Sequence, residues 1–344
     1  MGVRWLGGGA QTVEQARRSR AGRARRRRAP LVALACVLGL GAVGYGVLRF
    51  VPPVHQLALE TVVTSGHAKW ARLFASRAEV QRAWRLADGN PRVAVTKALH
   101  VTSTQGSRPP LQVESIEGPT WHGWLAIVRN PRDVHVLYSG LLGRYGEKVS
   151  AMAASAGASL AVNGGGFYDP LGKGNGGQPS GALIARGDLL HPPDSELVIG
   201  LTASGTLVAG HFTLAEIHSL DVTEAVAWRG PILVANGVGQ ITYGDGGWGY
   251  GPRTAIGQRR DGTILLVAID GRQIQSLGAS MREVQDLMLH YGAVTAVALD
   301  GGASTVMWQA GRGILNHPCS IYGERYVPDG FGVFLPTARA GGTR

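Results

Sequence analysis

The chain has 344 residues, with 34 lysines and arginines against 23 aspartates and glutamates and a formal net charge of +11. The charge is concentrated at one end, because residues 1–49 hold ten arginines and one acid, Glu14, and carry +9, which leaves +2 for the other 295 residues. A near-neutral body lacks the basic surface that binding to a nucleic-acid backbone requires, so the composition argues against DNA or RNA as a partner. With 44% hydrophobic and 17% charged residues, the chain is expected to be globular and not disordered.

An apolar run of twenty uncharged residues, 29–48, directly follows the arginine cluster. At 1.5 Å per residue this run spans about 30 Å, the thickness of a bilayer core. We therefore expect a transmembrane anchor at residues 29–51, a basic cytoplasmic tail at 1–28 and an extracellular remainder, in a single-pass cell-membrane protein. A cleaved signal peptide shows the same pattern and stays open as an alternative, and lipid attachment at Cys36 is a weaker one.

The rest of the chain divides by composition into three further parts. Residues 52–110 are the least informative and are interpreted as a stalk or accessory helical segment, with Trp70, Leu73, Phe74 and Trp84 on helix faces. Residues 111–336 are expected to form one α/β (mixed α+β) domain, built on a mixed β-sheet with parallel crossover units and hairpins. Residues 337–344 are interpreted as a flexible tail. Because the second cysteine, Cys319, has no partner in this domain, no disulfide framework is expected.

Short β-rich runs separated by turn residues fill the first and middle parts of this domain. Two pairs of runs read as hairpins, because Ser204-Gly205 and Asp261-Gly262 suit turns that need a positive φ. The predicted strands are 111–117, 121–129, 133–139, 197–201, 206–210, 253–258 and 263–270.

The apolar periodicity predicts two helices, at 147–156 and at 280–291, and Ser280 with Glu283 forms a capping box at the start of the second. Each helix is followed by a glycine, a buried strand and then a polar residue with a glycine pair. The first of these strands ends at Asn163-Gly164-Gly165 and the second at Asp300-Gly301-Gly302. Such turns present a polar side chain and exposed N–H groups to a ligand, and an internal duplication remains an open possibility.

Two aspartates are predicted to meet at one edge of the sheet. The strand 263–270 ends in Asp270, the helix follows, and the next strand ends in Asp300, which predicts a right-handed crossover with parallel, neighbouring strands. Ligand sites lie at the carboxyl edge of such sheets. Paired carboxylates suit glycosidic hydrolysis, and Arg253 and Arg272 would hold a phosphate. The alternative for either aspartate is a simple turn cap.

Two glycine-rich segments are candidate ligand-binding loops. Residues 164–181 contain eight glycines and have Tyr168 and Asp169 at their root, and they are interpreted either as a lid or as a flexible surface loop; their spacing is not that of a phosphate-binding P-loop. Residues 243–251 offer Trp248 and Tyr250 as platforms for a sugar ring, or as simple loop anchors.

Other chemistries fit less well. The ten histidines form no tight metal-binding motif, so no metal and no cofactor is expected. Ser304 lacks the final glycine of a nucleophile elbow. Cys319 beside His317 is interpreted as an inert buried thiol.

Five ordered motifs together resemble those of the phosphodiester glycosidase family, many of whose bacterial members carry labels of exopolysaccharide biosynthesis. The resemblance covers about residues 111–336, and the chain departs from the usual pattern at Gly166, where a second aromatic residue is frequent, and at Ala303, where glycine is frequent. The motifs are Asn163-Gly164-Gly165-Gly166-Phe167-Tyr168, Pro179-Ser180-Gly181, Arg253-Thr254-Ala255-Ile256-Gly257, Asp270-Gly271-Arg272 and Leu299-Asp300-Gly301-Gly302-Ala303-Ser304-Thr305.

The resemblance implies hydrolysis of the bond between the anomeric carbon of a sugar and a phosphodiester, here on cell-envelope or exopolysaccharide glycans. A non-catalytic glycan-binding or envelope-assembly factor is the main alternative, and a serine or cysteine hydrolase a distant one. The residues expected to act in catalysis are Asp270, Asp300, Arg253 and Arg272. The residues expected to bind substrate are Asn163, Gly164, Gly165, Tyr168, Gly301, Gly302, Ser304 and Thr305.

Overall fold

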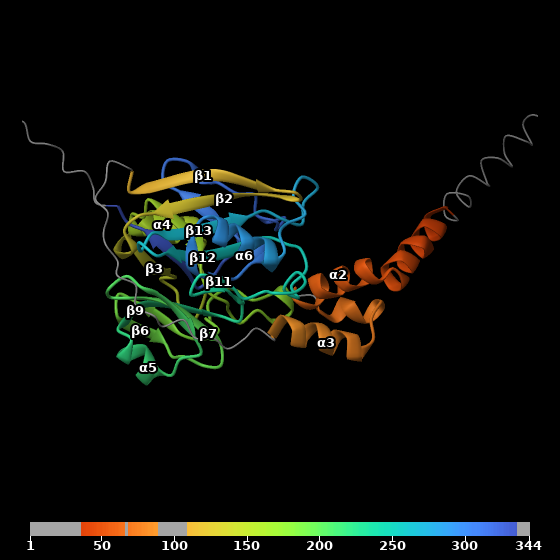
Figure 1. The fold of residues 1–344 in the computed structure, drawn as a ribbon, viewed down its shortest axis with the longest axis horizontal. Helices are drawn as coiled ribbons and strands as arrows, with labels where there is room; N and C mark the ends of the chain where they lie inside the picture. Colours follow the sequence, from red (N-terminus) through yellow and green to blue (C-terminus); the bar gives the residue numbers. More distant parts are fainter. Residues whose placement is uncertain (1–35, 66–67, 89–108, 336–344) are drawn as a thin grey trace, which may run out of the picture. The chain divides into compact units, whose positions relative to one another are not determined.

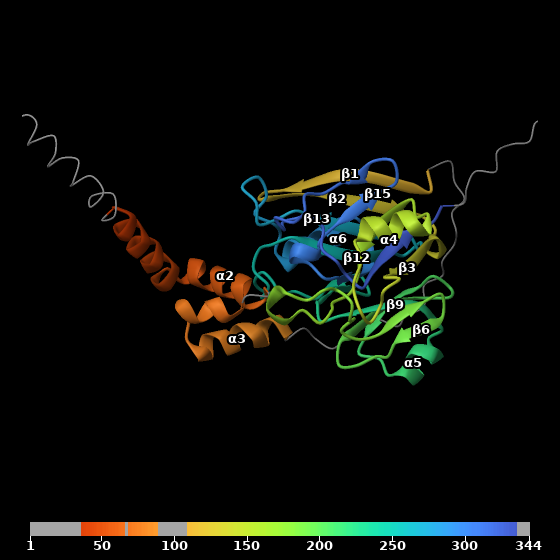
Figure 2. The same cartoon turned by 180° about the vertical axis from the view of Figure 1, so that it is seen from behind.

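The computed structural model describes residues 36–65, 68–88 and 109–335. The chain divides into two compact units, residues 1–56 and 57–344. Three β-sheets and their covering helices make up most of the second unit (Figures 1 and 2). The predictions for the tail at 1–28 and for residues 337–344 concern residues outside the described part.

The first sheet has seven strands, and its three central strands are buried along almost their whole length. In spatial order its strands are β1 (Leu111–Gly118), β2 (Trp121–Val128), β13 (Ile264–Ile269), β12 (Arg253–Arg259), β14 (Ala293–Ala298), β10 (Ile232–Ala235) and β11 (Val238–Gly239).

The second and third sheets have five strands each. The second sheet runs β16 (Gly313–Ile314), β15 (Met307–Gln309), β4 (Leu160–Asn163), β17 (Asp329–Val333) and β3 (Val134–Tyr138). The third runs β6 (Asp188–His191), β5 (Leu183–Ala185), β9 (Val222–Trp228), β7 (Leu197–Thr202) and β8 (Leu207–Gly210).

The helices are short, and the three that follow residue 109 each cover the outer side of one sheet. Figure 1 shows α5 at the periphery beside β6 and β9. The α-helices of the described residues are Cys36–Phe50, α2 (Pro52–Val63), α3 (Arg77–Asp88), α4 (Val149–Ala156), α5 (Leu214–Ser219) and α6 (Met281–His290). The 3-10 helices are η1 (Ala68–Leu73), η2 (Pro131–Asp133), η3 (Pro170–Gly172) and η4 (Gly302–Ser304).

One hydrophobic core joins the three sheets, because it combines inward side chains of all of them, such as Ile256, Phe331 and Ile199. The opposite face of the first sheet packs against the apolar stripe of α6, which contains Met281, Val284 and Met288. Burying these side chains is what positions the loops at the strand ends.

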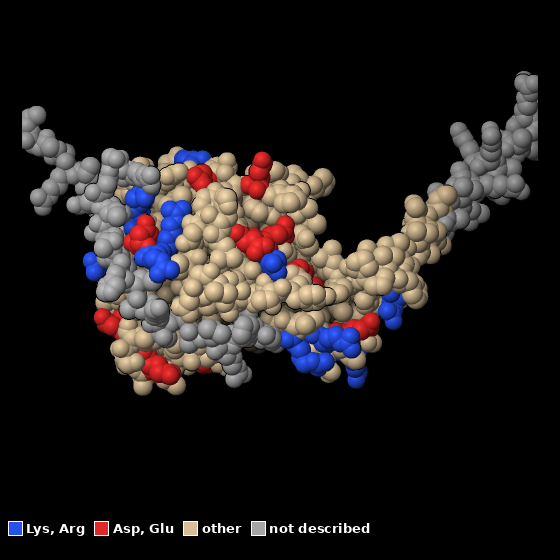
Figure 3. Space-filling model, viewed as in Figure 1, with Lys and Arg blue, Asp and Glu red and all other residues tan. Residues whose placement is uncertain are grey.

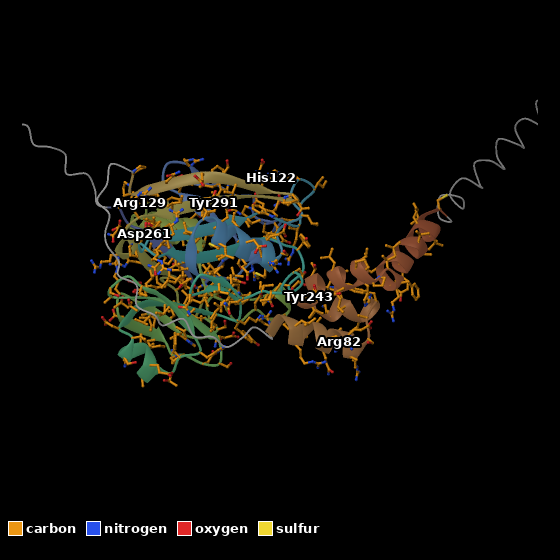
Figure 4. The ribbon with its side chains drawn as sticks, viewed as in Figure 1. Arg82, His122, Arg129, Tyr243, Asp261 and Tyr291 are labelled. Carbon is orange, nitrogen blue, oxygen red and sulfur yellow. The ribbon has the colours of Figure 1, made fainter. Side chains whose placement is uncertain are left out.

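Local chemistry explains the predicted helices and hairpins. Ser280 and Glu283 form the predicted capping box of α6, and α4 ends at Gly157 in the left-handed conformation. The hairpin of β12 and β13 turns at Asp261, labelled in Figure 4, and Gly262 has a φ of 91°. Gly205 similarly turns the hairpin of β7 and β8, with a φ of 86°.

The predicted parallel crossover is wrong in one respect. Every pairing between strands of the described part is antiparallel. The reason is that β12 folds back on β13 as a hairpin and then also pairs with β14, so it lies between the two predicted neighbours. Since both pair antiparallel to β12, β13 and β14 still run in the same direction and end at the same edge, near Arg253.

In the described part, no single helix is long and apolar enough to cross a membrane. The helices Cys36–Phe50 and Pro52–Val63 pass a test of length and composition only together, and they meet at a bend of 89°. The expectation of one straight anchor at residues 29–51 stays a prediction, because residues 29–35 lie outside the described part.

Candidate active site

A cavity of about 1470 Å³ opens where the strand ends of the first and second sheets converge with the glycine-rich loops. Its wall contains the strand-end residues Arg253, Arg272 and Asp300, with Gly301, Gly302 and Ser304. The 164–181 loop, the loop before β12 and segment 319–326 supply further lining residues. Six of the predicted site residues therefore share one cavity.

Two strand ends from different sheets are joined at the floor of this cavity. The Asp300 N–H donates to the Gly164 carbonyl oxygen (3.0 Å), and the Asn163 side-chain amide donates to the Asp300 carbonyl oxygen (2.6 Å). The Asn163 amide oxygen accepts from Thr254 Oγ1 at 2.7 Å and from the Val306 N–H at 3.1 Å. Asn163 is thus buried and hydrogen bonded through both its amide nitrogen and its amide oxygen, and it holds the Asp300 turn without lining the cavity.

Asp300 is the carboxylate best placed for proton transfer. It lies in the cavity wall, and burial raises its pKa to about 6, although the Ser304 hydroxyl, Arg325 and Arg229 lower it and Asp169 raises it further. A carboxyl group with a pKa near 6 is partly protonated close to neutral pH, which is what a general acid requires.

A second carboxylate, that of the buried Asp329 at the start of β17, lies close to the half-buried Asp300. Its Oδ1 accepts the Gly165 N–H at 2.6 Å, and a Cβ atom on Gly164 would overlap the same oxygen, so a glycine is needed there. Burial raises the pKa of Asp329 to about 7, the Gly165 hydrogen bond lowers it, and the negative charge of Asp300 raises it. Asp300 therefore ionises first.

Asp270 is held differently. Its carboxylate accepts hydrogen bonds from the His317 N–H at 2.7 Å, from His317 Nδ1 at 3.2 Å and from the Asn316 side chain at 3.2 Å. It is buried and is not part of the cavity lining, an arrangement that matches the turn-cap alternative. The pairing of Asp270 with Asp300 in catalysis stays a prediction.

Three arginines line the cavity without a carboxylate partner among the described residues: Arg229, Arg253 and Arg272. Burial, followed by repulsion from Arg272, lowers the pKa of Arg253 to about 9. Arg253 donates from Nε to the Ala279 carbonyl and from Nη2 to the carbonyls of Trp248 and Gly249, so it mainly holds the loop before β12. Unpaired guanidinium groups at a cavity wall suit an anionic ligand.

Arg272 is held in an unusual backbone conformation. Its φ of 59° is left-handed, which is uncommon for a residue with a side chain, and its N–H donates to the Leu277 carbonyl at 3.0 Å. A Cβ atom on Gly302 would come within 3.2 Å of Arg272 Nη1, so the absence of a side chain at 302 leaves room for the guanidinium. The adjacent thiol of Cys319 has a raised pKa because it is partly buried, which disfavours a nucleophilic thiolate.

Arg229 was missed by sequence reasoning. Its guanidinium lies over three tryptophan rings, 4.8 Å from the centroid of Trp84, 5.5 Å from Trp228 and 5.6 Å from Trp248. We call these three rings the tryptophan cage. A side chain on Gly166 would overlap the Trp228 ring, so the cage fills the space in which the family pattern frequently has an aromatic residue.

The remaining predicted binding residues lie beside the cavity. Thr305 is buried and hydrogen bonded to Thr254 at 3.3 Å, and Gly164 and Gly165 form the turn that supports the two carboxylates. Tyr168 is 65% exposed and lies outside the lining, whereas its neighbour Asp169 lines the cavity and pairs with Arg325 at 3.0 Å. The 164–181 loop thus forms a wall tied to segment 319–326.

Two other loop predictions have different outcomes. Trp248 is buried and lines the cavity, but Tyr250 is not among the lining residues. Within the described part there is no group of three or more His, Cys, Asp or Glu side chains that could hold a metal ion.

A family model described as phosphodiester glycosidase matches residues 156–334, which is just over half of the chain, and the chain belongs to this family of glycoside hydrolases. The chain is 28% identical over 244 residues to mouse N-acetylglucosamine-1-phosphodiester alpha-N-acetylglucosaminidase, a match that spans 63% of this chain and 44% of the relative. It is 39% identical over 85 residues to the SPbeta prophage-derived uncharacterized protein YomE of Bacillus subtilis, or 25% of this chain and 13% of that one. The chain thus spans less than half the length of these curated relatives.

Among solved structures, the fold resembles the catalytic domain of zebrafish N-acetylglucosamine-1-phosphodiester alpha-N-acetylglucosaminidase. The TM-score is 0.58 at 21% identity, over 73% of this chain and 92% of that one. An exported protein of Burkholderia pseudomallei gives a TM-score of 0.50 at 20% identity, over 62% and 74% of the two chains. These likenesses support the fold.

Proposed function

We propose that the chain hydrolyses a sugar-1-phosphodiester, releasing the free sugar and a phosphomonoester, and that N-acetylglucosamine is the first sugar to test. The sugar is the one that the name of the mouse relative specifies. The observation that carries the proposal is the juxtaposition of Asp300, a partly protonated carboxyl at neutral pH, with unpaired arginines in one cavity.

The chemistry follows from these groups. Asp300 in its protonated form donates its proton to the oxygen that bridges the anomeric carbon and phosphorus, as the bond from that carbon to the oxygen breaks. Arg272 and Arg229 hold the phosphate and stabilise the charge that develops on it. Water supplies the new hydroxyl on the anomeric carbon, and its second proton returns to Asp300. Asp329 lies outside the cavity lining, and the negative charge of ionised Asp300 raises its pKa, so it stays protonated when Asp300 ionises.

The rim of the cavity supports a glycan substrate larger than one sugar. Tyr145, Tyr322 and Tyr326, which we call the rim tyrosines, line the cavity and are 56%, 87% and 56% exposed. Exposed apolar side chains grouped at a cavity mouth are typical of ligand-binding grooves. The two rim segments are fixed by hydrogen bonds from Ser150 to the Glu324 carboxylate, at 2.8 Å from its N–H and 2.5 Å from its hydroxyl. This is the support for a cell-envelope or exopolysaccharide glycan.

Membrane attachment with an extracytoplasmic catalytic unit is the other part of the proposal. It is supported by the arginine-rich N-terminus, the apolar run behind it and the bent helix pair. Figure 3 shows lysines and arginines gathered over α3, and Trp70 and Leu73 are 53% and 65% exposed in the preceding η1. Basic residues beside exposed apolar ones favour an anionic lipid surface.

The test is release of free N-acetylglucosamine from an alkyl phosphodiester of N-acetylglucosamine 1-phosphate by the purified full chain. Wild-type protein should release the sugar, and Asp300→Asn should not. If the wild-type chain binds the diester without turnover, and Asp300→Asn binds it equally well, the non-catalytic glycan-binding alternative replaces this proposal.

A further inference from the structure

The accessory helical segment contributes directly to the candidate active site. The segment of residues 57–88 lies outside the 156–334 region matched by the family model. Nevertheless Thr64 and Ser65 line the cavity, and Trp84 of α3 provides the ring closest to Arg229. A part of the chain with no counterpart in the matched family region therefore completes the surroundings of an active-site arginine.

The segment is fixed to the cavity wall by specific contacts. Trp248 Nε1 donates to the Ala87 carbonyl at 3.3 Å, and Thr64 Oγ1, which donates to the Glu60 carbonyl at 2.8 Å, also lies 3.3 Å from the Trp248 carbonyl. The same Trp248 carbonyl accepts from Arg253 Nη2 at 3.0 Å. Ala87 of α3, and Thr64 directly after α2, thus contact the residue whose carbonyl holds a predicted active-site arginine.

Arg229 is held by ring faces and not by acceptors. The described residues provide neither a hydrogen bond nor a salt bridge to its guanidinium. Its side chain contacts the three rings of the tryptophan cage. Stacking uses the faces of the guanidinium and leaves the in-plane N–H donors available. Because Arg229 lines the cavity, these donors are available to a ligand there.

We propose that Arg229 binds the phosphate of the substrate and that Trp84, from the accessory helical segment, is the positioning residue that holds Arg229 at the cavity wall. The inference rests on the proposed function for the identity of the phosphate. Through the cage, the accessory segment sets the anion affinity of an active site that belongs to the family domain.

The first experiment measures binding. N-acetylglucosamine 1-phosphate is titrated by calorimetry into the full-length wild-type chain, Trp84→Ala, Trp84→Phe, Arg229→Ala and the double variant Trp84→Ala/Arg229→Ala. Trp84→Ala should weaken binding about 3- to 30-fold, the range of a cation–π contact that is partly desolvated, and Trp84→Phe should recover most of the loss. In the Arg229→Ala background, Trp84→Ala should change affinity by less than about 2-fold, because a residue that acts through another adds nothing once that residue is gone.

Trp70→Ala is the matched control. Trp70 lies in the same segment, is 53% exposed and has the Lys69 ammonium over its ring. Because this contact does not involve Arg229, Trp70→Ala should leave affinity unchanged. Thermal unfolding of each variant identifies any that fails to fold, and Trp84→Phe then carries the comparison. The proposal is overturned if Trp84→Ala binds as wild type does, or if it weakens binding equally in the Arg229→Ala background.

The second readout is the pH profile of kcat/KM. Asp300 is faced by Ser304, Arg325, Arg229, Asp169 and Asp329, and the positive charge of Arg229 lowers its pKa. If Trp84→Ala releases Arg229 from the wall, the alkaline limb should move to higher pH, and it should not move in Trp70→Ala. An unshifted limb in a folded Trp84→Ala would contradict the positioning role. A wild-type chain that binds the phosphate without turnover would defeat the proposed hydrolysis but leave the binding test intact.

Discussion

The side-chain amide of Asn163 donates a hydrogen bond to the main-chain carbonyl of Asp300 at 2.6 Å, and this bond connects the end of a strand in one sheet to the end of a strand in another. The position of the candidate acid therefore depends on a residue that does not line the cavity. A buried amide with three partners is costly to remove, because its partners would be left unsatisfied.

Asn163→Ala should consequently lower kcat more than it raises KM. We expect a loss of about 10- to 100-fold in kcat, since the substitution displaces Asp300 from its reacting position and leaves the arginines in place. Steady-state kinetics on the phosphodiester measure both constants. Thr254→Ser, which keeps the hydroxyl that donates to Asn163 at 2.7 Å, is the conservative control, and a kcat for Asn163→Ala equal to that of wild type would contradict the positioning role.

Activity should depend on the protonated form of Asp300. Because burial raises the pKa of this carboxyl to about 6, kcat/KM should decline as the pH rises through about 6. Asp300→Asn should reduce kcat by about 100- to 10,000-fold and abolish this limb, whereas Asp270→Asn should retain the limb. A limb that persists in Asp300→Asn would assign the proton transfer to another group.

The two carboxyls with raised pKa values should also make stability depend on pH. Their folded-state pKa values, about 6 for Asp300 and about 7 for Asp329, lie above the ordinary value of 3.8, so the folded chain binds more protons than the unfolded chain at intermediate pH. Their stabilising contribution is complete below about pH 4 and is lost as the pH rises through 6 and 7. Asp329→Asn should therefore raise the free energy of unfolding by about 1 to 4 kcal/mol at pH 8 and by much less at pH 4.

Denaturant unfolding at the two pH values makes this comparison. The asparagine keeps an oxygen that can accept the Gly165 N–H, so the substitution removes the titratable carboxyl and keeps this hydrogen bond. The interpretation fails if Asp329→Asn is destabilised equally at both pH values.

The rim tyrosines should distinguish long substrates from short ones. Tyr322→Ala, at a position 87% exposed, should lower kcat/KM about 5- to 50-fold on a phosphodiester carrying an oligosaccharide, because it removes an apolar contact at the mouth of the cavity. It should leave the alkyl diester of a single sugar within about 2-fold. Tyr243→Ala is a suitable control, since Tyr243, labelled in Figure 4, is 93% exposed and is not among the residues that line the cavity. If Tyr322→Ala lowers kcat/KM equally on both substrates, the rim tyrosines are not part of the substrate-binding site.

The sequence predicted the local elements well because their signals are local. The capping box of α6, the glycine stop of α4 and the Asp261-Gly262 turn each depend on residues within a few positions of one another. The order of strands in a sheet depends instead on which strands, far apart in the sequence, pair with each other. The pairing of β12 with both β13 and β14 could not be read from a strand, helix, strand pattern alone.

The same distinction applies to the site. Asp300, Arg272 and Arg253 follow or open buried strands, and the pattern of a strand with a polar residue and a glycine found them. Asp329-Gly330 is also a polar residue followed by a glycine. It lies at the beginning of β17, however, and the pattern applies to the ends of strands. Arg229 and Trp84 are 145 positions apart, and neither has a local signal that would connect it to the other.

The charge environment of Asp300 is drawn from separate segments of the chain, including Arg229 after β9, Asp169 in the glycine-rich loop and Arg325 near the rim. A substitution at Asp169 or Arg325 changes the proton affinity of Asp300 without altering Asp300 or the turn that holds it. The acidity at which the chain works best can therefore be retuned by replacements at the periphery. Family members that work at different ambient pH can keep the same reacting carboxyl and differ only in the charged residues that surround it.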